Sequence, residues 1–276
     1  MSKLLPQHLT HIRAAGYSTR TITARENVLT AADRALPDGL DTPTTDELAA
    51  WLATPTWSGW TRATYYHHLT GFYRWAATGH NPHISWDPSA DLTPPKNPSD
   101  TPHPVTDAEL LQALARSDDR WKLIISLAAY AGLRAAEICR QDRKEINEER
   151  VLILRGKGDK TATVPTHPEI WRLIQDRPPG LLVPGIRIAR MTPKLLSSKA
   201  RYHFDSINMP DVHLHRFRHW YATALLRNGT DIRTLQSLMR HASLQTTARY
   251  LEIADEQRRF AVSTLPVPSS PQQDAA

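Results

Sequence analysis

A proline-rich stretch at the end of the first third of the chain interrupts an otherwise helical pattern. Residues 81–106 read NPHISWDPSADLTPPKNPSDTPHPVT, which is too rich in Pro, Asp, Ser and Asn to sustain a regular element. The chain has 276 residues, enough for two domains with separate cores. We therefore predict a first domain over residues 1–86, a linker over 87–104, a second domain over 105–265 and a disordered tail over 266–276.

Helical signals dominate both predicted domains. Thr44 and Glu47 have the spacing of a capping box, and so do Thr106 and Glu109 at the start of the second domain. The exception is VLILRGKGDKTATVP at 151–165, an apolar run followed by a glycine-containing turn and a second short strand. This pattern predicts a β-hairpin, so the fold class is mainly α with a small β-hairpin or sheet in the second domain.

The charge balance indicates a polyanionic partner. Lys and Arg number 34 against 28 Asp and Glu, which gives a net charge of +6 and a sequence pI near 9.5. Nucleic acid is the usual partner of such a surplus, and a basic but inert surface is the alternative.

Cysteine usage and hydropathy indicate the compartment. Cys139 is the only cysteine in the sequence, which excludes an intramolecular disulfide and favours a reducing interior, and we expect it in the core. The longest apolar stretch, LIISLAAYAGL, is shorter than the roughly 20 residues of a membrane span. The N-terminal apolar run is also too short for a signal peptide, so we expect a soluble cytoplasmic protein without a membrane partner.

Four short motifs of the second domain carry candidate chemistry: AGLRAAEI, RGKGDK, HRFRH and HASLQTTARY. Arg134 follows an apolar run that should be buried, so it needs an anion or acceptors, and Glu137 lies one helical turn further on. The pairing does not exclude that Arg134 also binds a phosphate. Lys157 stands between glycines at the predicted hairpin tip, either as a solvated turn residue or as a group that reaches a phosphate.

The HRFRH motif places His215 and Arg218 on one helical face near a helix N-terminus, where anions are favoured. A metal site is the alternative, because His215 and His219 have the i, i+4 spacing of zinc helices and His213 is close by. No glutamate lies between these histidines, and Arg216 and Arg218 would repel a divalent ion. We therefore expect no metal, and nothing in the motifs calls for a cofactor.

Two arginines, a lysine, two histidines and Tyr250 form a set that suits phosphoryl transfer without a metal ion. Arginine guanidinium groups bind nonbridging phosphate oxygens in pairs and stabilise the charge that develops in the transition state. A tyrosine hydroxyl can act as the nucleophile. The alternative for Tyr250 is an ordinary aromatic with a buried ring and an accessible hydroxyl.

These motifs, in this order, resemble those of the tyrosine recombinase (phage integrase) family over nearly the whole chain. The resemblance implies a two-domain DNA clamp, in which a helical, SAM-like core-binding domain is followed by a catalytic domain. It assigns roles by motif position: Arg134 as the first catalytic arginine with Glu137 supporting it, Lys157 as the general acid, His215 and Arg218 as the HxxR pair, His241 as the last active-site histidine and Tyr250 as the nucleophile.

The implied reaction is site-specific strand exchange on double-stranded DNA. Tyr250 attacks the scissile phosphate and forms a 3′-phosphotyrosyl bond, with no metal or ATP. Because a tyrosine hydroxyl ordinarily loses its proton only near pH 10, a base is required, and His215 is the expected one. The family assembles four protomers on two sites. The segment DEQRRFAVSTL after Tyr250 is expected to pass to a neighbour, or else to pack on its own domain. We expect recognition of core sites only, since the chain has no room for an arm-binding domain.

Three residues depart from the family pattern. Arg240 stands where glycine is usual, which implies either a differently shaped turn or an added DNA contact, and Arg216 and Trp220 are larger or more charged than expected. None of them removes a catalytic group. The alternatives to a recombinase are a catalytically altered DNA-binding accessory protein of the same fold, a type IB topoisomerase-like enzyme and, more remotely, a metal-dependent nuclease.

Overall fold

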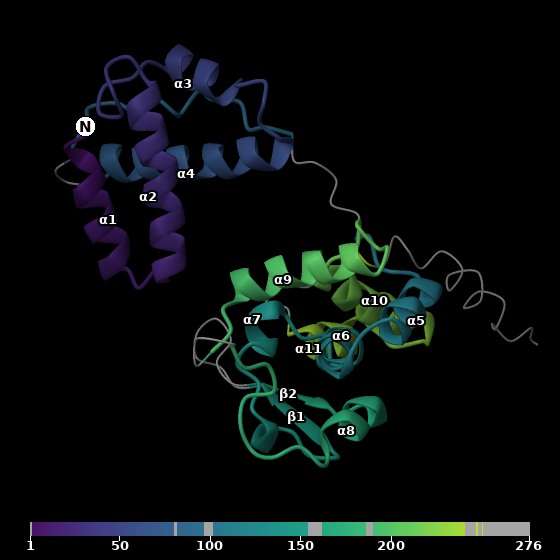
Figure 1. Cartoon of the computed structure of the whole chain (residues 1–276). Coiled ribbons are helices and arrows are strands. Elements are labelled where there is room, and N and C mark those ends of the chain that lie inside the picture. The colour runs from purple at the N-terminus through teal and green to yellow at the C-terminus, as the bar shows by residue number, and fades with distance from the viewer. Residues whose placement is uncertain are drawn as a thin grey trace, which may run out of the picture. The chain divides into compact units, whose positions relative to one another are not determined.

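The chain folds into two compact units, Met1–Ser99 and Asp100–Ala276 (Figure 1). The computed structural model describes residues 2–79, 82–96, 102–153, 162–185, 190–240, 247 and 250. Each unit has its own hydrophobic core. Across these described ranges, no helix is both long enough and apolar enough to cross a membrane.

The described part of the first unit contains four helices: α1 (Leu4–Ala14), α2 (Thr19–Ala35), α3 (Thr45–Leu52) and α4 (Gly59–Ala77). The capping box predicted at Thr44 and Glu47 is confirmed, because each side chain accepts a hydrogen bond from the other residue's backbone N–H. α4 packs against the other three helices and crosses α2 in Figure 1. Its Phe72 and Tyr73 side chains are fully buried, and the Tyr73 hydroxyl donates to the Leu40 carbonyl at 2.9 Å.

The first unit extends into the segment that composition assigns to the linker. Leu92 is only 7% exposed and belongs to the core of this unit. The Tyr66 hydroxyl donates to the Leu92 carbonyl at 3.4 Å, and the Thr45 hydroxyl donates to the Pro88 carbonyl at 3.0 Å. Part of the predicted linker, up to Leu92, is therefore packed structure. Its proline content correctly excludes a helix but does not reveal that Leu92 supplies apolar surface to the core.

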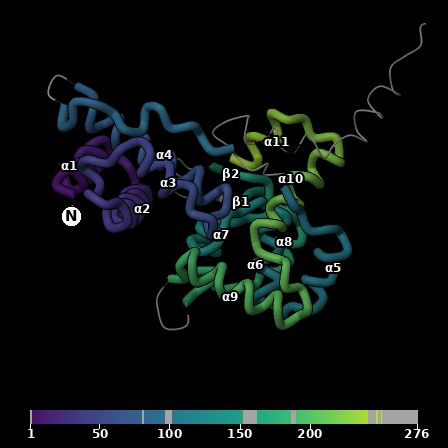
Figure 2. Tube along the Cα trace, turned by 90° about the horizontal axis from the view of Figure 1, so that it is seen from above, coloured from purple at the N-terminus to yellow at the C-terminus, as the bar shows by residue number. Residues whose placement is uncertain are grey.

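The second unit is built around helix α6 (Asp119–Tyr130), which contacts α5, α7, α8 and α10 (Figures 1 and 2). Residues 123–129 of α6 are all buried. The predicted capping box at Thr106 and Glu109 is confirmed at the start of α5. The other described helices are α5 (Asp107–Ala115), α7 (Ala135–Ile138), the short 3-10 helix η1 (Arg143–Glu145), α8 (Pro168–Ile174), α9 (Pro193–Ser206), α10 (Leu214–Arg227) and α11 (Ile232–Met239).

The predicted β-hairpin forms a two-stranded antiparallel sheet. Strand β1 (Arg150–Ile153) pairs with β2 (Ala162–Pro165) in a register that places Val151 opposite Val164. Both of these valines are buried in the core of the second unit, as is Cys139. The mainly α fold class with a small sheet is therefore confirmed. The hairpin tip, including Lys157, lies outside the described residues, and so does the predicted tail.

Candidate active site

Arg134 stands just after α6, where the chain turns at Gly132 with a φ of 60°. It is the N-cap residue of α7, and its backbone N–H donates to Glu137 Oε2 at 2.8 Å. Its Nη1 donates to Glu137 Oε1 at 3.0 Å, so the pairing predicted from the sequence is confirmed. The Arg134 side chain is nevertheless 40% exposed, which leaves its guanidinium accessible to a phosphate.

Arg218 lies on α10 and is only 1% exposed. Its Nη2 donates to the Met239 carbonyl at 2.7 Å, and its Nη1 donates to the Gly132 carbonyl. Burial, followed by the neighbouring charges of Arg134 and Arg240, lowers the pKa of Arg218 to about 9, so the group remains cationic at neutral pH. The sequence indicated a phosphate-binding arginine near the helix start. The structure places its guanidinium against the carbonyls of Gly132, which follows α6, and of Met239, the last residue of α11.

Arg240 completes a cluster of three arginines. Its Nη2 lies 2.7 Å from Glu137 Oε2 and donates to the Gly132 carbonyl at 3.0 Å. Burial raises the pKa of Glu137, but Arg240, the Arg134 backbone N–H and the Arg134 and Arg218 charges together outweigh it and lower that pKa. In this arginine cluster (Arg134, Arg218 and Arg240 with Glu137), three positive charges face one negative charge, and 3 − 1 leaves a surplus of +2 that suits a phosphate.

The sequence left two interpretations of Arg240 open, a differently shaped turn and an added DNA contact, and the structure bears on each. Its backbone adopts the left-handed conformation, with φ 54° and ψ 43°, that a glycine would adopt at this helix end, so the turn keeps the glycine-like shape. The side chain is only 11% exposed and is directed into the protein, toward Glu137. In this conformation Arg240 is part of the arginine cluster and is not a surface group.

Tyr250 is 3% exposed, and its hydroxyl oxygen lies 2.7 Å from Nδ1 of His219 on α10. The His215 ring, one helical turn earlier, lies 4.4 Å from the His219 ring, at 78° to it. The sequence favoured His215 as the base and considered His219 only as a metal ligand, although the i, i+4 spacing already placed the two on one face. His241 lies outside the described residues.

The metal alternative gains no support from the described part of the chain. No group of three or more His, Cys, Asp or Glu side chains there is arranged to hold a metal ion. The imidazole of His213 is at the N-cap of α10 and its pKa is lowered by burial and then by the Arg216 charge.

The two other unusual residues attach α10 to the beginning of the second unit. Arg216 donates from Nε to the His103 carbonyl at 3.2 Å and from Nη2 to the Pro104 carbonyl at 3.3 Å. The Trp220 indole donates to Asp107 at 2.5 Å. The helix that carries the histidines and Arg218 is therefore tied at two further points to the chain that enters this unit.

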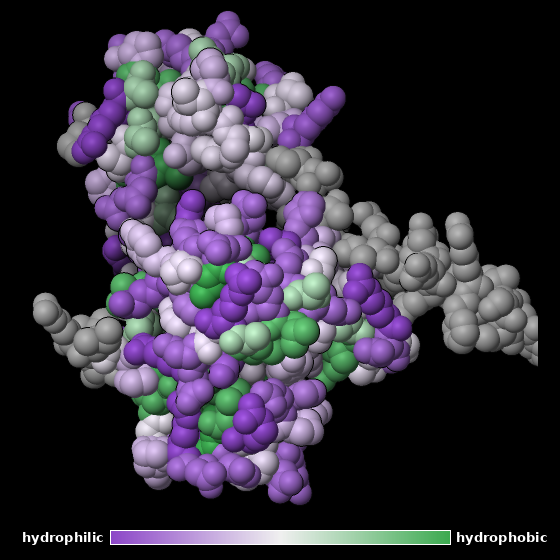
Figure 3. All heavy atoms as spheres, turned by 45° about the vertical axis from the view of Figure 1, so that its right-hand side comes forward, coloured by the Kyte–Doolittle hydropathy of each residue, from purple (hydrophilic) through white to green (hydrophobic). Residues whose placement is uncertain are grey.

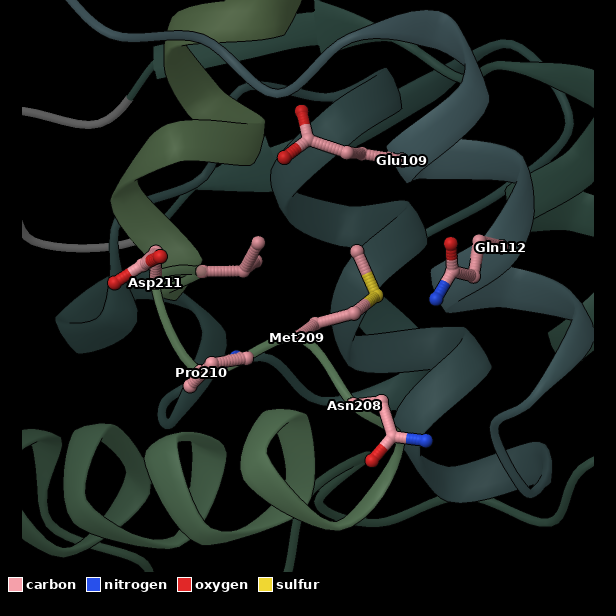
Figure 4. Close-up of a pocket in the computed structure, with 7 residues that line it drawn as sticks. Glu109, Gln112, Asn208, Met209, Pro210 and Asp211 are labelled. Carbon is pink, nitrogen blue, oxygen red and sulfur yellow. The ribbon is translucent and has the colours of Figure 1, made fainter.

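A hollow of about 200 Å³ lies beside these attachments, between α5 and the segment that joins α9 to α10 (Figure 4). Its lining includes the carboxylates of Glu109 and Asp211, and Glu109 pairs with Arg216 at 3.4 Å. An acidic lining repels phosphate, so this hollow is a poor place for the DNA backbone. On the face seen in Figure 3, hydrophilic residues predominate and apolar residues form small separate patches.

Comparison with known proteins decides the family. Residues 105–257, all within the second unit, match the model of the phage integrase family. The chain belongs to the phage integrase family. Tyrosine recombinase XerC of Rhodospirillum centenum is 31% identical over 256 residues, which cover 82% of this chain and 73% of that protein. Tyrosine recombinase XerA of Pyrococcus horikoshii is 33% identical over 183 residues, 62% of this chain and 64% of that protein.

The match to some of these relatives is partial, since the aligned part spans 64% of the Pyrococcus horikoshii XerA and 59% of the Mesorhizobium japonicum XerC. Solved structures share the fold of this phage integrase family member. A lambda integrase dimer bound to a COC′ core site gives a TM-score of 0.73 at 18% identity, covering 88% of this chain and 95% of that one. XerH bound to palindromic difH substrate gives 0.70 at 19% identity, covering 94% and 83%.

Proposed function

We propose that this protein is a site-specific DNA recombinase or integrase that cleaves and rejoins double-stranded DNA through Tyr250. The observation that carries the proposal is the 2.7 Å contact between the Tyr250 hydroxyl and His219, on the same helix as Arg218 of the arginine cluster. A hydroxyl beside a base and near surplus positive charge is equipped to attack a phosphodiester. Relatives named tyrosine recombinases support the proposal.

The proposed step conserves atoms and charge. The Tyr250 oxygen bonds to the scissile phosphorus while the bond from phosphorus to the 5′ oxygen breaks, which leaves a 3′-phosphotyrosyl link and a 5′ hydroxyl. The tyrosine proton passes to a histidine, and Lys157 supplies a proton to the departing 5′ oxygen. A 5′ hydroxyl of the partner strand then attacks the link, so the reaction consumes no ATP. Arg134, the exposed member of the cluster, binds the nonbridging oxygens.

Two histidines compete for the role of base. His219 has the contact with the hydroxyl, whereas His215 is exposed at the start of α10. A base must lie within hydrogen-bonding reach of the proton that it removes, which favours His219 in this conformation. Because Tyr250 is only 3% exposed, it must become accessible before it meets a phosphate, and that change can bring His215 into the role. Comparing the pH dependence of cleavage in His215→Gln and His219→Gln separates the two.

The assembly and the place of action are part of the proposal. The first domain acts as the core-binding domain, and four protomers act on two core sites, with the segment after Tyr250 passing to a neighbour. A lambda integrase tetramer bound to a Holliday junction has the same fold as this chain, with a TM-score of 0.71 at 18% identity. The site of action is the cytoplasm.

The decisive experiment traps the covalent link. Duplexes are first selected from a random-sequence pool by binding to the full chain, and each is then nicked at successive positions so that cleavage becomes irreversible. In EDTA, the wild type and the control Tyr130→Phe should form a covalent DNA adduct, and Tyr250→Phe should not. An adduct that persists in Tyr250→Phe would contradict the proposed nucleophile.

The role of Lys157 has its own test. Replacing the 5′ bridging oxygen of the scissile phosphate with sulfur gives a leaving group that needs no proton. Lys157→Ala should be inactive on the oxygen substrate and selectively rescued on the sulfur substrate. Equal inactivity on both substrates would remove Lys157 as the general acid.

A further inference from the structure

Arg240 occupies a backbone conformation that its own residue type disfavours. Among the described residues other than glycine, Asn208 and Arg240 alone have a positive φ. Asn is enriched in this region and arginine is not, so a non-glycine residue persists there only when surrounding contacts hold it. Its backbone N–H donates to the Ser237 carbonyl at 3.0 Å, and the side chain adds further contacts that hold it at the end of α11.

Those contacts converge on two groups that serve the other arginines. Arg240 Nη2 lies 2.7 Å from Glu137 Oε2 and 3.0 Å from the Gly132 carbonyl, while Nη1 donates to the Leu238 carbonyl at 2.9 Å. Glu137 is the carboxylate that pairs with Arg134, and the Gly132 carbonyl also accepts from Arg218. Arg240 thus shares one acceptor with each of the other two arginines.

The ion pair between Arg240 and Glu137 is largely buried, which strengthens it. The side chains of Arg240 and Glu137 are 11% and 10% exposed, against 40% for Arg134. A charge pair that is screened from water interacts more strongly than an exposed pair, and removing one partner leaves a costly buried charge. Arg240 therefore holds the Glu137 carboxylate from its buried side. The same carboxylate binds the more exposed Arg134 on its other side.

We propose that Arg240 is a positioning residue for phosphate binding: through Glu137, which it shares with Arg134, it holds Arg134 in the orientation that binds the scissile phosphate. The inference rests on the proposed function and deepens it. A glycine at this turn would adopt the same backbone conformation, but it has no guanidinium to pair with Glu137.

The test uses Arg240→Gly, which keeps the turn free of strain while removing the guanidinium, and Arg240→Lys, which keeps a charge but not the two-pronged geometry. Arg172→Ala is the matched control, because Arg172 pairs with Glu169 at 2.7 Å on an exposed helix face. Circular dichroism checks that each variant is folded. On the selected nicked duplex, Arg240→Gly should cleave about 10- to 100-fold more slowly in a single turnover, with unchanged DNA affinity. Arg240→Lys should lie between Arg240→Gly and the wild type, and Arg172→Ala should match the wild type.

A second substrate distinguishes a loss of Arg134 positioning against the phosphate from a general destabilisation of the fold. Replacing one nonbridging oxygen of the scissile phosphate with a methyl group removes the negative charge that Arg134 meets. The ratio of wild-type to Arg240→Gly cleavage rates should then fall toward one. A purely structural defect would slow both substrates equally and overturn the inference.

The outcomes separate this inference from the proposed function. A Tyr250-dependent adduct in the wild type, together with an unchanged rate in Arg240→Gly, overturns the role of Arg240 alone. The absence of any Tyr250-dependent adduct in the wild type overturns the proposed function and this inference with it.

Discussion

At Gly132 we expect the addition of a single methyl group to destabilise the second unit. Its φ of 60° lies in the left-handed region, and a Cβ built there would lie 2.6 Å from Tyr221 Cδ1 and 2.7 Å from Cε1. Real Cβ atoms essentially never approach a heavy atom to less than 3.0 Å, so the ring or the backbone must shift. Tyr221 is only 9% exposed and has little freedom to do so.

The cost of Gly132→Ala has two parts. The left-handed backbone costs a non-glycine residue about 1–2 kcal/mol. Overpacking against the buried ring of Tyr221 adds about 1–3 kcal/mol. Together the substitution should lower the free energy of unfolding of the second unit by about 2–5 kcal/mol, a large fraction of the stability of an ordinary domain.

The control is Gly229→Ala in the same unit. Gly229 also has a positive φ, 84°, but a Cβ there meets no heavy atom within 4 Å, so only the backbone part of the cost applies. The urea dependence of amide hydrogen exchange in α6 measures the free energy of unfolding of the second unit in the full chain. The two variants should differ by about 1–3 kcal/mol. In Gly132→Ala/Tyr221→Leu the two losses should be less than additive.

Two results would refute this reasoning. Equal losses in Gly132→Ala and Gly229→Ala would show that the ring contact carries no cost. Strict additivity with Tyr221→Leu would show that the two residues do not interact.

Replacing His219 with alanine removes the partner of the Tyr250 hydroxyl and should slow single-turnover cleavage by about 100-fold with DNA binding unchanged; an unaltered rate would exclude a role for the contact. Trp220→Phe loses the hydrogen bond to Asp107 and should lower the free energy of unfolding in urea by about 1 kcal/mol, whereas no loss would argue against that bond. Because the folded protein lowers the pKa of Glu137 below its ordinary value of 4.5, the ionised carboxylate stabilises the fold above that value, and this contribution disappears as the pH falls through the lowered pKa. Glu137→Gln should therefore be destabilised more at pH 7 than at about pH 3, and a pH-independent difference would refute the assignment.

The features that the sequence predicted correctly depend on residues close together in the chain. The capping box at Thr44 and Glu47 requires only a three-residue spacing, and the same spacing predicted the pair of Arg134 and Glu137. Local spacing decides these contacts, because a helical turn brings such side chains together whatever the rest of the fold does.

The features that the sequence could not predict join distant segments. Arg240 pairs with Glu137 across 103 positions, and Tyr250 meets His219 across 31. The first contact joins the end of α11 to α7, and the second joins α10 to a residue beyond α11, and no local pattern specifies either packing. The burial of Leu92 was missed for the same reason, since proline content describes the backbone of that segment and not the core that covers it.

The attachment of Arg216 to the carbonyls of His103 and Pro104 bears on the design of chimeric proteins. An engineer who exchanges the first unit would naturally cut the chain at the end of the proline-rich stretch, beside Val105. That junction would replace the two residues whose carbonyls bind the Arg216 guanidinium. Arg216 lies on α10, the helix that also carries His219 and Arg218. The interchangeable module therefore ends before His103, and the two residues that follow the cut belong with the second unit, whose helix α10 they bind through Arg216.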